Sequence, residues 1–367
     1  MKGIRRRLII LIFLIVLSVG LNFYLSSGNA AVSKYIRRCF LPVQNFKSNL
    51  LNFTGISIGD YLYLFLSFFL ISRLIRFVYF GITFLKNKTD FFREILSILN
   101  FGFTIYLVFL ISWGGNYYRP NLATQWSRDI DKNWNTQSLV RLNHFLVGKL
   151  NLLSDSAMQF PKLKELNREA NTFYHQDFGD CLPELKVKVT TLGYMLNYAG
   201  VHGYYNPLTG EGQFNHQLPG FMHPFVVTHE MAHQAGIGAE DDANLLAYLV
   251  DVRSSNPAFQ YSGYFNIFLY AYTNLREKDS LSARQIWQSL NTKSQDDYLD
   301  LKDLYRRYRS IMRGLSNDIY DNYLKWNGQQ KGLGSYDMVV RWVYYWEFIA
   351  KEKADISICP SGIHQTK

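Results

Sequence analysis

Three long apolar stretches make up about half of the first third of the chain. They cover residues 8–25, 57–80 and 95–113, and the second continues toward Leu85 as an amphipathic pattern. Each is close to the roughly 17–25 residues that a helix needs to cross the hydrocarbon core of a bilayer. The pattern predicts three transmembrane helices at about these positions, within a membrane anchor formed by residues 1–114.

Beyond residue 114 the continuous apolar runs give way to periodic ones. Apolar residues at every third or fourth position are typical of amphipathic helices, and alternation rich in β-branched residues is typical of strands. The pattern predicts strands over 185–191, 201–205 and 211–215, and helices over 138–153, 161–173, 242–252, 264–275, 283–290, 298–326 and 336–350. We therefore expect the α+β class: transmembrane helices, then a mostly helical domain, residues 115–367, with a small antiparallel sheet.

The formal charge of +10 belongs to the first part of the chain. Residues 1–114 carry 13 Lys and Arg against 3 Asp and Glu, whereas residues 115–367 carry 26 of each kind. The basic excess therefore flanks the apolar stretches, as it does in membrane proteins. We expect a lipid bilayer as a partner and no nucleic acid.

The same charges predict an orientation, because Lys and Arg favour the cytoplasmic side of a membrane. Basic residues at 2–7 and 73–93 put the N-terminus and the second connection inside, so that residues 115–367 lie outside the cytoplasm. Basic residues at 34–47, in the first connection, favour the opposite orientation. An alternative for residues 8–25 is a signal peptide cleaved near residues 28–31, which leaves the domain on the same side.

The segment that follows the third apolar stretch is rich in aromatic residues. Residues 113–120 read WGGNYYRP. Trp and Tyr favour the membrane surface because their rings are apolar and their edges polar. We expect this segment to anchor the chain there and not to bind substrate.

One segment carries metal-binding chemistry. Residues 225–236 read FVVTHEMAHQAG and contain the HExxH motif, formed by His229, Glu230 and His233. Residues four apart share a helix face, so both imidazoles reach one tetrahedral Zn²⁺, while Glu230 remains available to a water molecule. Pro224 suits the start of that helix and Gly236 its end. The sequence predicts a zinc site with two histidine ligands and Glu230 as catalytic base.

A catalytic zinc site needs a third protein ligand and one open position. The segment GAEDDAN at 238–244 follows the motif closely and opens the next predicted helix. We expect Glu240 to be the ligand, with Asp242 as the alternative. In the metzincin spacing HExxHxxGxxH, the corresponding residue is Ala239, which cannot bind a metal.

Two stretches resemble known families. The pattern Glu-x-x-Ala-Asn after HExxH, here Glu240 to Asn244, resembles the gluzincin-like zinc peptidases, in which this glutamate is the third ligand. The stretches HEMAHQAGIGAEDDANLLAYL and YYNPLTGEGQFN, with the three apolar stretches, resemble an uncharacterised bacterial family of membrane-anchored zincin-like proteins. This resemblance covers most of the chain and implies a zincin-like fold, but no activity comes with it. Only six residues separate His233 from Glu240, fewer than in the better-known gluzincins.

These features predict a membrane-anchored zinc metallopeptidase of the HExxH type, with a peptide or protein as substrate. The strand at 201–205 or 211–215 either aligns an extended substrate or only packs against the motif helix. Candidates for an oxyanion donor are His202, His216, His223 and Tyr336.

The sequence leaves two other classes of function to consider. A catalytically inactive zincin-like membrane scaffold that binds partners is the main alternative, although a purely structural site does not need a glutamate in the position of Glu230. A transporter is disfavoured because the apolar stretches contain few charged residues, among them Asp60 and Arg73 near their ends.

Overall fold

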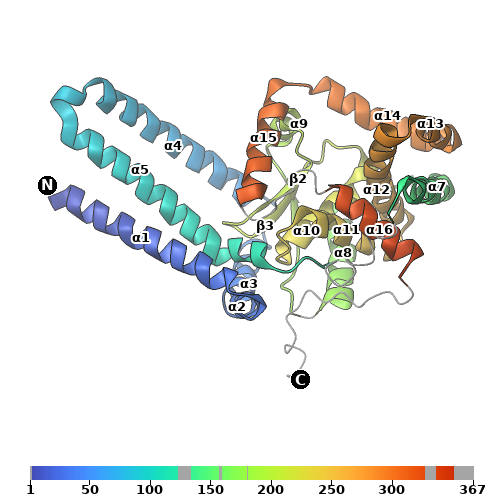
Figure 1. Ribbon diagram of the computed structural model, residues 1–367, viewed down its shortest axis with the longest axis horizontal. Coiled ribbons are helices and arrows are strands. Elements are labelled where there is room, and N and C mark those ends of the chain that lie inside the picture. The colour runs from blue at the N-terminus through green and yellow to red at the C-terminus, as the bar shows by residue number, and fades with distance from the viewer. Residues whose placement is uncertain (1, 123–133, 157–158, 180, 327–335, 351–367) are drawn as a thin grey trace.

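Three apolar helices extend together from one side of a helical domain (Figure 1). The computed structural model describes residues 2–122, 134–156, 159–179, 181–326 and 336–350. Helices α1 (Lys2–Ser26), α4 (Ile58–Ile82) and α5 (Phe84–Ser112) are each long and apolar enough to cross a membrane. The three predicted apolar helices are therefore confirmed. The third begins earlier than predicted, because polar residues such as Lys86 and Asp90 continue the helix before the apolar run.

The connection between α1 and α4 is helical, which the sequence pattern did not predict. It contains α2 (Asn29–Tyr35), the π-helical turn η1 (Ile36–Phe40) and α3 (Leu41–Leu51). One face of α3 packs against the domain, where Gln44 and Ser48 are buried and Gln44 Nε2 donates to the Gly210 carbonyl at 2.8 Å. The first connection is thus part of the folded domain.

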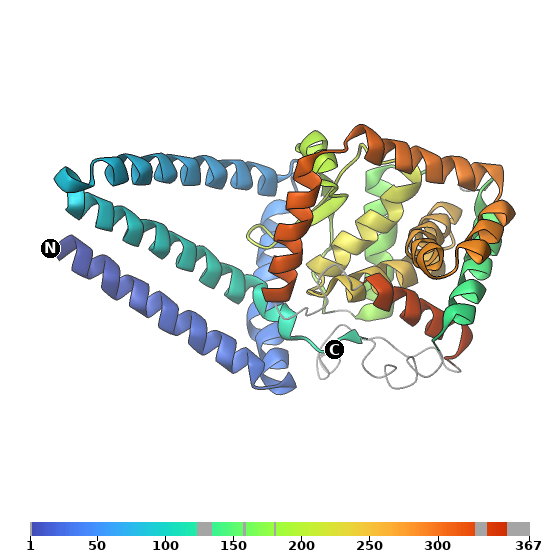
Figure 2. The same cartoon turned by 45° about the horizontal axis from the view of Figure 1, so that its top comes forward.

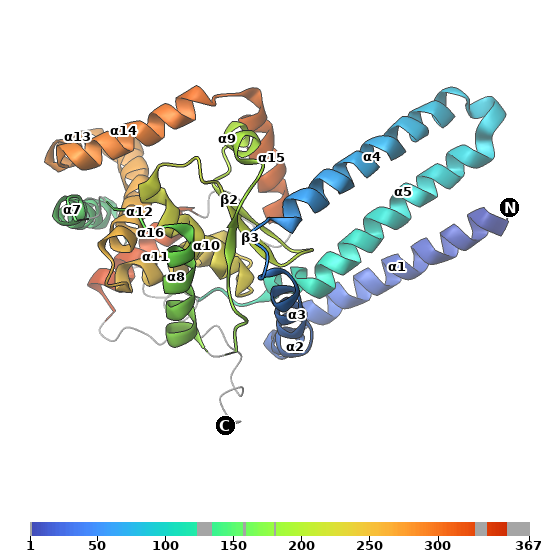
Figure 3. The ribbon, with the colours of Figure 1, turned by 180° about the vertical axis from the view of Figure 1, so that it is seen from behind.

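A three-stranded sheet lies between the ends of the apolar helices and the rest of the domain (Figures 1 and 3). Its strands are β1 (Val187–Val189), β2 (Gly203–Asn206) and β3 (Glu211–Phe214), in the order β1-β3-β2. β2 and β3 form the predicted antiparallel hairpin, but β1 pairs with β3 in parallel. The prediction of an antiparallel sheet was therefore wrong. Local alternation identifies strands but does not fix which strands pair.

The two faces of the sheet meet different partners. Gly212 of β3 packs against Glu230 and Gln234 of α10 (His223–Gln234). On the opposite face, Glu211 forms a buried ion pair with Lys188 Nζ at 2.5 Å and accepts the Gly59 N–H at 2.6 Å. The start of α4 is therefore bonded directly to the sheet that supports α10.

Helices enclose one large apolar core behind the sheet. α11 (Glu240–Arg253) is central, with Leu245, Leu246 and Leu249 fully buried, and it packs between α10 and α12 (Pro257–Lys278). The remaining helices surround this core: α7 (Thr136–Leu153), α8 (Leu163–Phe178), α13 (Ser280–Ser289), α14 (Thr292–Arg307) and α16 (Tyr336–Phe348).

The helix predicted over 298–326 is two helices in the structure. α14 ends at Arg307, and α15 (Ile311–Trp326) leaves in a new direction (Figure 2). The Ser310 hydroxyl between them donates to the Tyr198 carbonyl of α9 (Gly193–Ala199), a short helix that was not predicted. This tertiary bond fixes a break that periodicity alone does not reveal.

Candidate metal centre

Helix α10, which carries the HExxH motif, is held in place by burial and by hydrogen bonds to α8 and α11. Its residues from Pro224 to Thr228 are buried, and Thr228 Oγ1 contacts Asp251 Oδ1 of α11 at 3.0 Å. The Tyr174 hydroxyl of α8 donates to the Thr228 carbonyl at 2.7 Å. These contacts orient the helix turn that carries His229 and His233.

Gly236 ends α10 and returns the chain toward the motif. Its φ of +84° lies in the left-handed region, and the Gly236 and Ile237 N–H groups donate to the His233 and Ala232 carbonyls at 3.0 Å each. This is the Schellman arrangement that glycine favours at helix ends. The Ile237 carbonyl also lies 2.7 Å from His233 Nδ1, so Nε2 of that ring is left facing the site. The turn explains how Glu240 returns to the motif after only six intervening residues.

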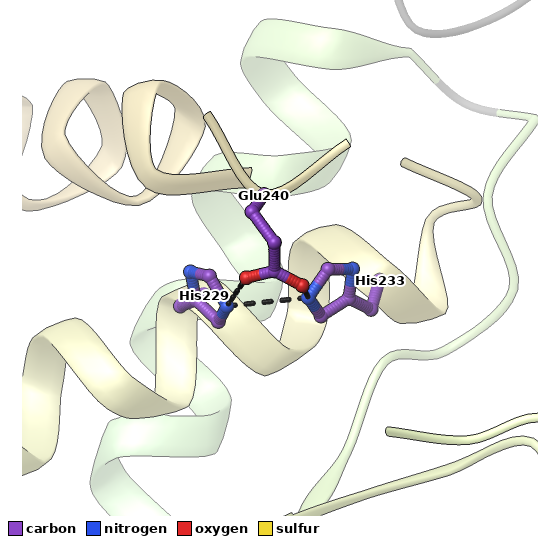
Figure 4. A group of neighbouring side chains, drawn as sticks. All are labelled: His229, His233 and Glu240. Carbon is purple, nitrogen blue, oxygen red and sulfur yellow. Dashed lines mark hydrogen bonds and ion pairs between the residues drawn. The ribbon is translucent and has the colours of Figure 1, made fainter. Parts of the chain in front are cut away.

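His229, His233 and Glu240 converge on one point (Figure 4). The two Nε2 atoms are 3.2 Å apart. His229 Nε2 lies 3.4 Å from Glu240 Oε2, and His233 Nε2 lies 3.4 Å from the other oxygen, Oε1. Four tetrahedral ligands at the usual zinc distance of about 2.0–2.1 Å lie roughly 3.3 Å from one another. The three side chains are therefore spaced as the ligands of one tetrahedral ion would be.

Asp242, the alternative ligand, points elsewhere. Its two carboxylate oxygens accept the Leu122 N–H at 3.1 and 3.2 Å. It does not belong to the described group of His229, His233 and Glu240 whose donor atoms lie within 4.8 Å of one another. Of the two candidates, only Glu240 reaches the imidazoles.

The protonation of the cluster reflects burial and close charges. Burial favours the neutral form of Glu240, but the two imidazoles outweigh it and hold the pKa of that carboxyl well below its usual value. Burial also lowers the pKa of His233, but the carboxylates of Glu240 and Glu230 outweigh it and raise that pKa to about 9. A proton therefore balances the Glu240 charge in the metal-free protein. A bound cation would take over that role.

Glu230 is buried beside the cluster and under the sheet. It is 3% exposed, and its Oε2 has no hydrogen-bond partner among the described residues. Burial raises the pKa of Glu230 to about 8. A Cβ atom at Gly203 would lie 2.6 Å from Glu230 Oε1, so the hairpin approaches this carboxylate closely because β2 has a glycine there.

A cavity of about 600 Å³ opens over the cluster. Glu230, His229 and His233 form part of its wall. Its other lining residues come from the hairpin, from the segment after α5, and from α11, α12, α14 and α15: among them are Trp113, Tyr117, His202, Tyr204, Tyr205, Asn244, Asn266, Tyr270, Tyr305, Arg313, Ser316 and Asn317.

The predicted oxyanion donors differ in whether they line the cavity. His202 lines the cavity, and its Nε2 lies 2.7 Å from the Tyr305 hydroxyl. Burial, with the nearby Arg313 charge, lowers the pKa of His202 to about 4, so its ring is neutral at physiological pH. His216 is exposed and His223 bonds the Leu218 carbonyl at 2.8 Å; neither lines the cavity. The side chain of Tyr336, the first residue of α16, lies outside the described residues.

A match to a protein family covers all residues of the site. Residues 35–344 match the model of a family described as a protein of unknown function, DUF3810. The chain belongs to the DUF3810 family. No curated protein and no solved structure matches the chain. The predicted membership of an uncharacterised family is confirmed, as are helices apolar enough to cross a membrane. The zincin-like fold of this DUF3810 chain stays a prediction.

Tyr305 and Arg313 were not identified from the sequence. They lie on either side of the break between α14 and α15, and the Arg313 guanidinium sits 4.6 Å from the centre of the Tyr305 ring. The stretch reads as one continuous helical pattern, so it gave no reason to expect either residue at the site. The nearest available signal was Ser310, a residue that is less favourable inside a helix than at its ends.

Proposed function

We propose that this chain is a membrane-anchored zinc-dependent metallopeptidase that hydrolyses peptide bonds. The observation that carries the proposal is the joint position of four side chains. His229, His233 and Glu240 are spaced as ligands of one ion, and the buried Glu230 carboxylate stands beside them with one oxygen unpartnered among the described residues. A structural zinc site would typically close all four positions and has no use for such a carboxylate.

Each residue of the cluster has a distinct role in this proposal. His229 and His233 through Nε2, and Glu240 through its carboxylate, would hold the zinc ion. The bound ion supplies Lewis acidity, which lowers the pKa of a water toward about 7 and polarises the scissile carbonyl. Glu230 accepts the proton from the attacking water and passes it to the leaving amine. The Ile237 carbonyl keeps the His233 ring oriented by holding Nδ1.

His202 and Tyr305 are two of the groups in the cavity wall that could donate a hydrogen bond to the developing oxyanion. Both line the cavity, and their 2.7 Å contact holds them as a pair. A neutral imidazole or a phenol O–H can donate a hydrogen bond to an oxyanion without adding a full charge to the site.

The hairpin offers a place for the substrate backbone. β2 is an edge strand of the sheet, and residues 202–205 line the cavity beside Glu230. An extended peptide can add to such an edge through main-chain hydrogen bonds. This arrangement supports a polypeptide as the substrate class.

The distribution of charge supports an extracytoplasmic site. The basic residues at 5–7 and 86–93 belong to the ends of the apolar helices that point away from the domain (Figure 1). Of the opposing charges in the first connection, Lys47 is engaged within the fold, where its Nζ donates to the Pro207 carbonyl at 2.6 Å. We infer that the N-terminus is cytoplasmic and the catalytic domain outside.

The test uses the full chain in lipid nanodiscs. Elemental analysis should find close to one zinc per chain in the wild-type protein and in Glu230→Gln. Glu230→Gln should lose peptide cleavage by about 10²–10⁴-fold, the usual effect of removing a general base. A folded chain that binds no zinc overturns the proposal. Zinc binding without any Glu230-dependent cleavage would favour the inactive scaffold.

A further inference from the structure

Helix α15 has two faces of different character. Arg313, Ser316 and Asn317 line the cavity over the metal centre. On another face Ile311, Met312, Leu315 and Ile319 are exposed by 93, 59, 58 and 61%. Their spacing forms one apolar stripe on the helix surface. Such a stripe is unfavourable in water unless an apolar partner covers it.

The short helix α9 extends this stripe. Tyr194, Met195 and Tyr198 are exposed by 67, 61 and 45%, and α9 packs directly against α15. We call the exposed residues of these two helices the α9–α15 face. Its members are Tyr194, Met195, Tyr198, Ile311, Met312, Leu315 and Ile319.

The α9–α15 face lies where the membrane surface would be. In both views α15 runs across the direction of the apolar helices, at the level where α4 begins (Figures 1 and 2). Near the start of α4, Tyr61 and Phe65 are exposed by 53 and 64%, as expected for lipid-facing residues. Exposed apolar residues are therefore present both on a candidate span and on the neighbouring part of the domain.

Helix α3 shows the same division. Its Gln44 and Ser48 are buried against the domain, whereas Phe46 and Leu50 are exposed by 67 and 53%. Residues two apart on a helix lie on nearly opposite sides, so the apolar side of α3 faces away from the domain. Helices α3 and α15 thus both cross the direction of the apolar helices at a similar level (Figure 2), and both carry exposed apolar residues.

We propose that the α9–α15 face lies in the interfacial layer of the bilayer, so that the site acts on polypeptide segments held at the lipid surface. The chemistry of the face fits this layer: two tyrosines suit the headgroup region, and aliphatic residues enter the acyl boundary. The exposed Arg307 and Arg309, directly before α15, suit lipid phosphates.

The position of the cavity links this surface to the substrate, a step that rests on the proposed peptidase function. One part of the cavity wall comes from α15, whose other face would contact lipid. Another part comes from Trp113 and Tyr117, directly after the end of α5. A segment that emerges from the bilayer, or is tethered to it, would therefore reach the metal centre without leaving the membrane surface.

The lipid contact is tested by nitroxide accessibility, which does not depend on activity. One cysteine at a time replaces Leu315, Ile319, Phe65 or Leu281 in the full chain with Cys39→Ser, reconstituted in phosphatidylethanolamine–phosphatidylglycerol vesicles. Cys39 is the free cysteine among the described residues, whereas Cys181 is in a disulfide and does not take the label. Leu281 is the water reference, because it is 77% exposed on α13, on the side of the domain away from the apolar helices (Figure 1). Nitroxides at positions 315 and 319 should collide more with apolar oxygen than with a water-soluble nickel chelate, and the same is expected at position 65 in α4.

Two results would overturn the lipid contact. If positions 315 and 319 behave as position 281 does, the face is in water. If both reagents are excluded there, a second copy or another protein covers the face.

The substrate class is tested with a quenched fluorescent peptide library, either free or carrying a palmitoyl anchor. The wild-type protein should cleave the anchored library at least tenfold faster, and Leu315→Glu with Ile319→Glu should bring the ratio near one while zinc content stays unchanged. Leu281→Glu is the matched control and should keep the wild-type ratio. Equal cleavage of both libraries by the wild-type protein overturns the substrate class alone. No cleavage of either refutes the peptidase function, and the nitroxide result still decides the lipid contact.

Discussion

The indole nitrogen of Trp113 donates a 3.0 Å hydrogen bond to the backbone carbonyl of His233. Trp113 directly follows α5, and His233 is one of the three clustered side chains. Arg119 reaches the same turn, with its Nη1 2.8 Å from the Gly236 carbonyl. The segment expected only to anchor the chain at the membrane surface therefore also supports the end of the motif helix.

Trp113→Phe removes this bond while keeping an aromatic ring. A single neutral hydrogen bond contributes about 0.5–1.5 kcal/mol, so zinc affinity should fall by up to about tenfold. Competition with a chromogenic chelator measures the change. Unaltered zinc affinity would mean that the third apolar helix and the metal centre are energetically independent.

Glu240→Gln and Asp242→Asn form a matched pair that identifies the third ligand. Glu240→Gln should weaken zinc binding by more than the roughly 10–100-fold that follows loss of even an outer-shell partner. Asp242→Asn should retain zinc, because Asp242 bonds the Leu122 N–H and not the metal cluster. Zinc titration of both purified variants decides the assignment, and the reverse pattern would make Asp242 the ligand.

Gly203→Ala should separate catalysis from metal binding. Its Cβ would lie 2.6 Å from Glu230 Oε1 and 2.8 Å from the Gln213 carbonyl, so the carboxylate must move. A general base contributes about 10²–10⁴-fold to the rate of the catalysed reaction, and much of this contribution is lost when the base is displaced. We expect a loss of cleavage by at least about tenfold with zinc content unchanged.

Gly148→Ala is the control for this change. Gly148 lies within α7, and a Cβ there has no described atom within 4 Å. In an exposed helix interior, alanine stabilises by up to about 1 kcal/mol relative to glycine. Activity should be unaffected, and a similar loss in both variants would exclude a specific effect at Gly203.

Lys188 and Glu211 form a buried ion pair on the face of the sheet opposite α10. Both side chains are at most 2% exposed. Lys188→Met leaves the Glu211 carboxylate without its cation and should lower the free energy of unfolding by about 3–5 kcal/mol. Adding Glu211→Gln removes the unpaired charge and should recover part of the loss. Thermal unfolding in detergent measures both, and additive losses would show that the pair is not coupled.

The sequence predicted the features that depend on local spacing. The apolar length of residues 8–25 identified a helix long and apolar enough to cross a membrane, and the four-residue spacing of His229 and His233 identified a shared helix face. The proximity of Glu240 was also predicted, because Gly236 permits a tight reversal at the helix end.

Features that depend on tertiary pairing were not predictable in this way. The parallel pairing of Val187 with Gly212 joins segments separated by α9 and β2, and no local pattern encodes it. The contact of Arg313 with Tyr305 depends on the break at Ser310, which is fixed by a bond to α9. The helices between residues 29 and 51 gain their partners only when the domain has formed beside them.

Within this segment, Phe40 is fully buried beneath the turn that ends the motif helix. A Cβ at Gly236 would approach its ring to 2.5 Å, so the two residues touch. In the sequence Phe40 lies between the first two apolar helices, whereas His229, His233 and Glu240 come more than a hundred residues later. Cleavage that separates the domain from residues 1–112 would therefore remove side chains that belong to the interior of the domain. We therefore expect a domain that is cut from the apolar helices to be unstable by itself, so that an intact metal centre would require the whole chain.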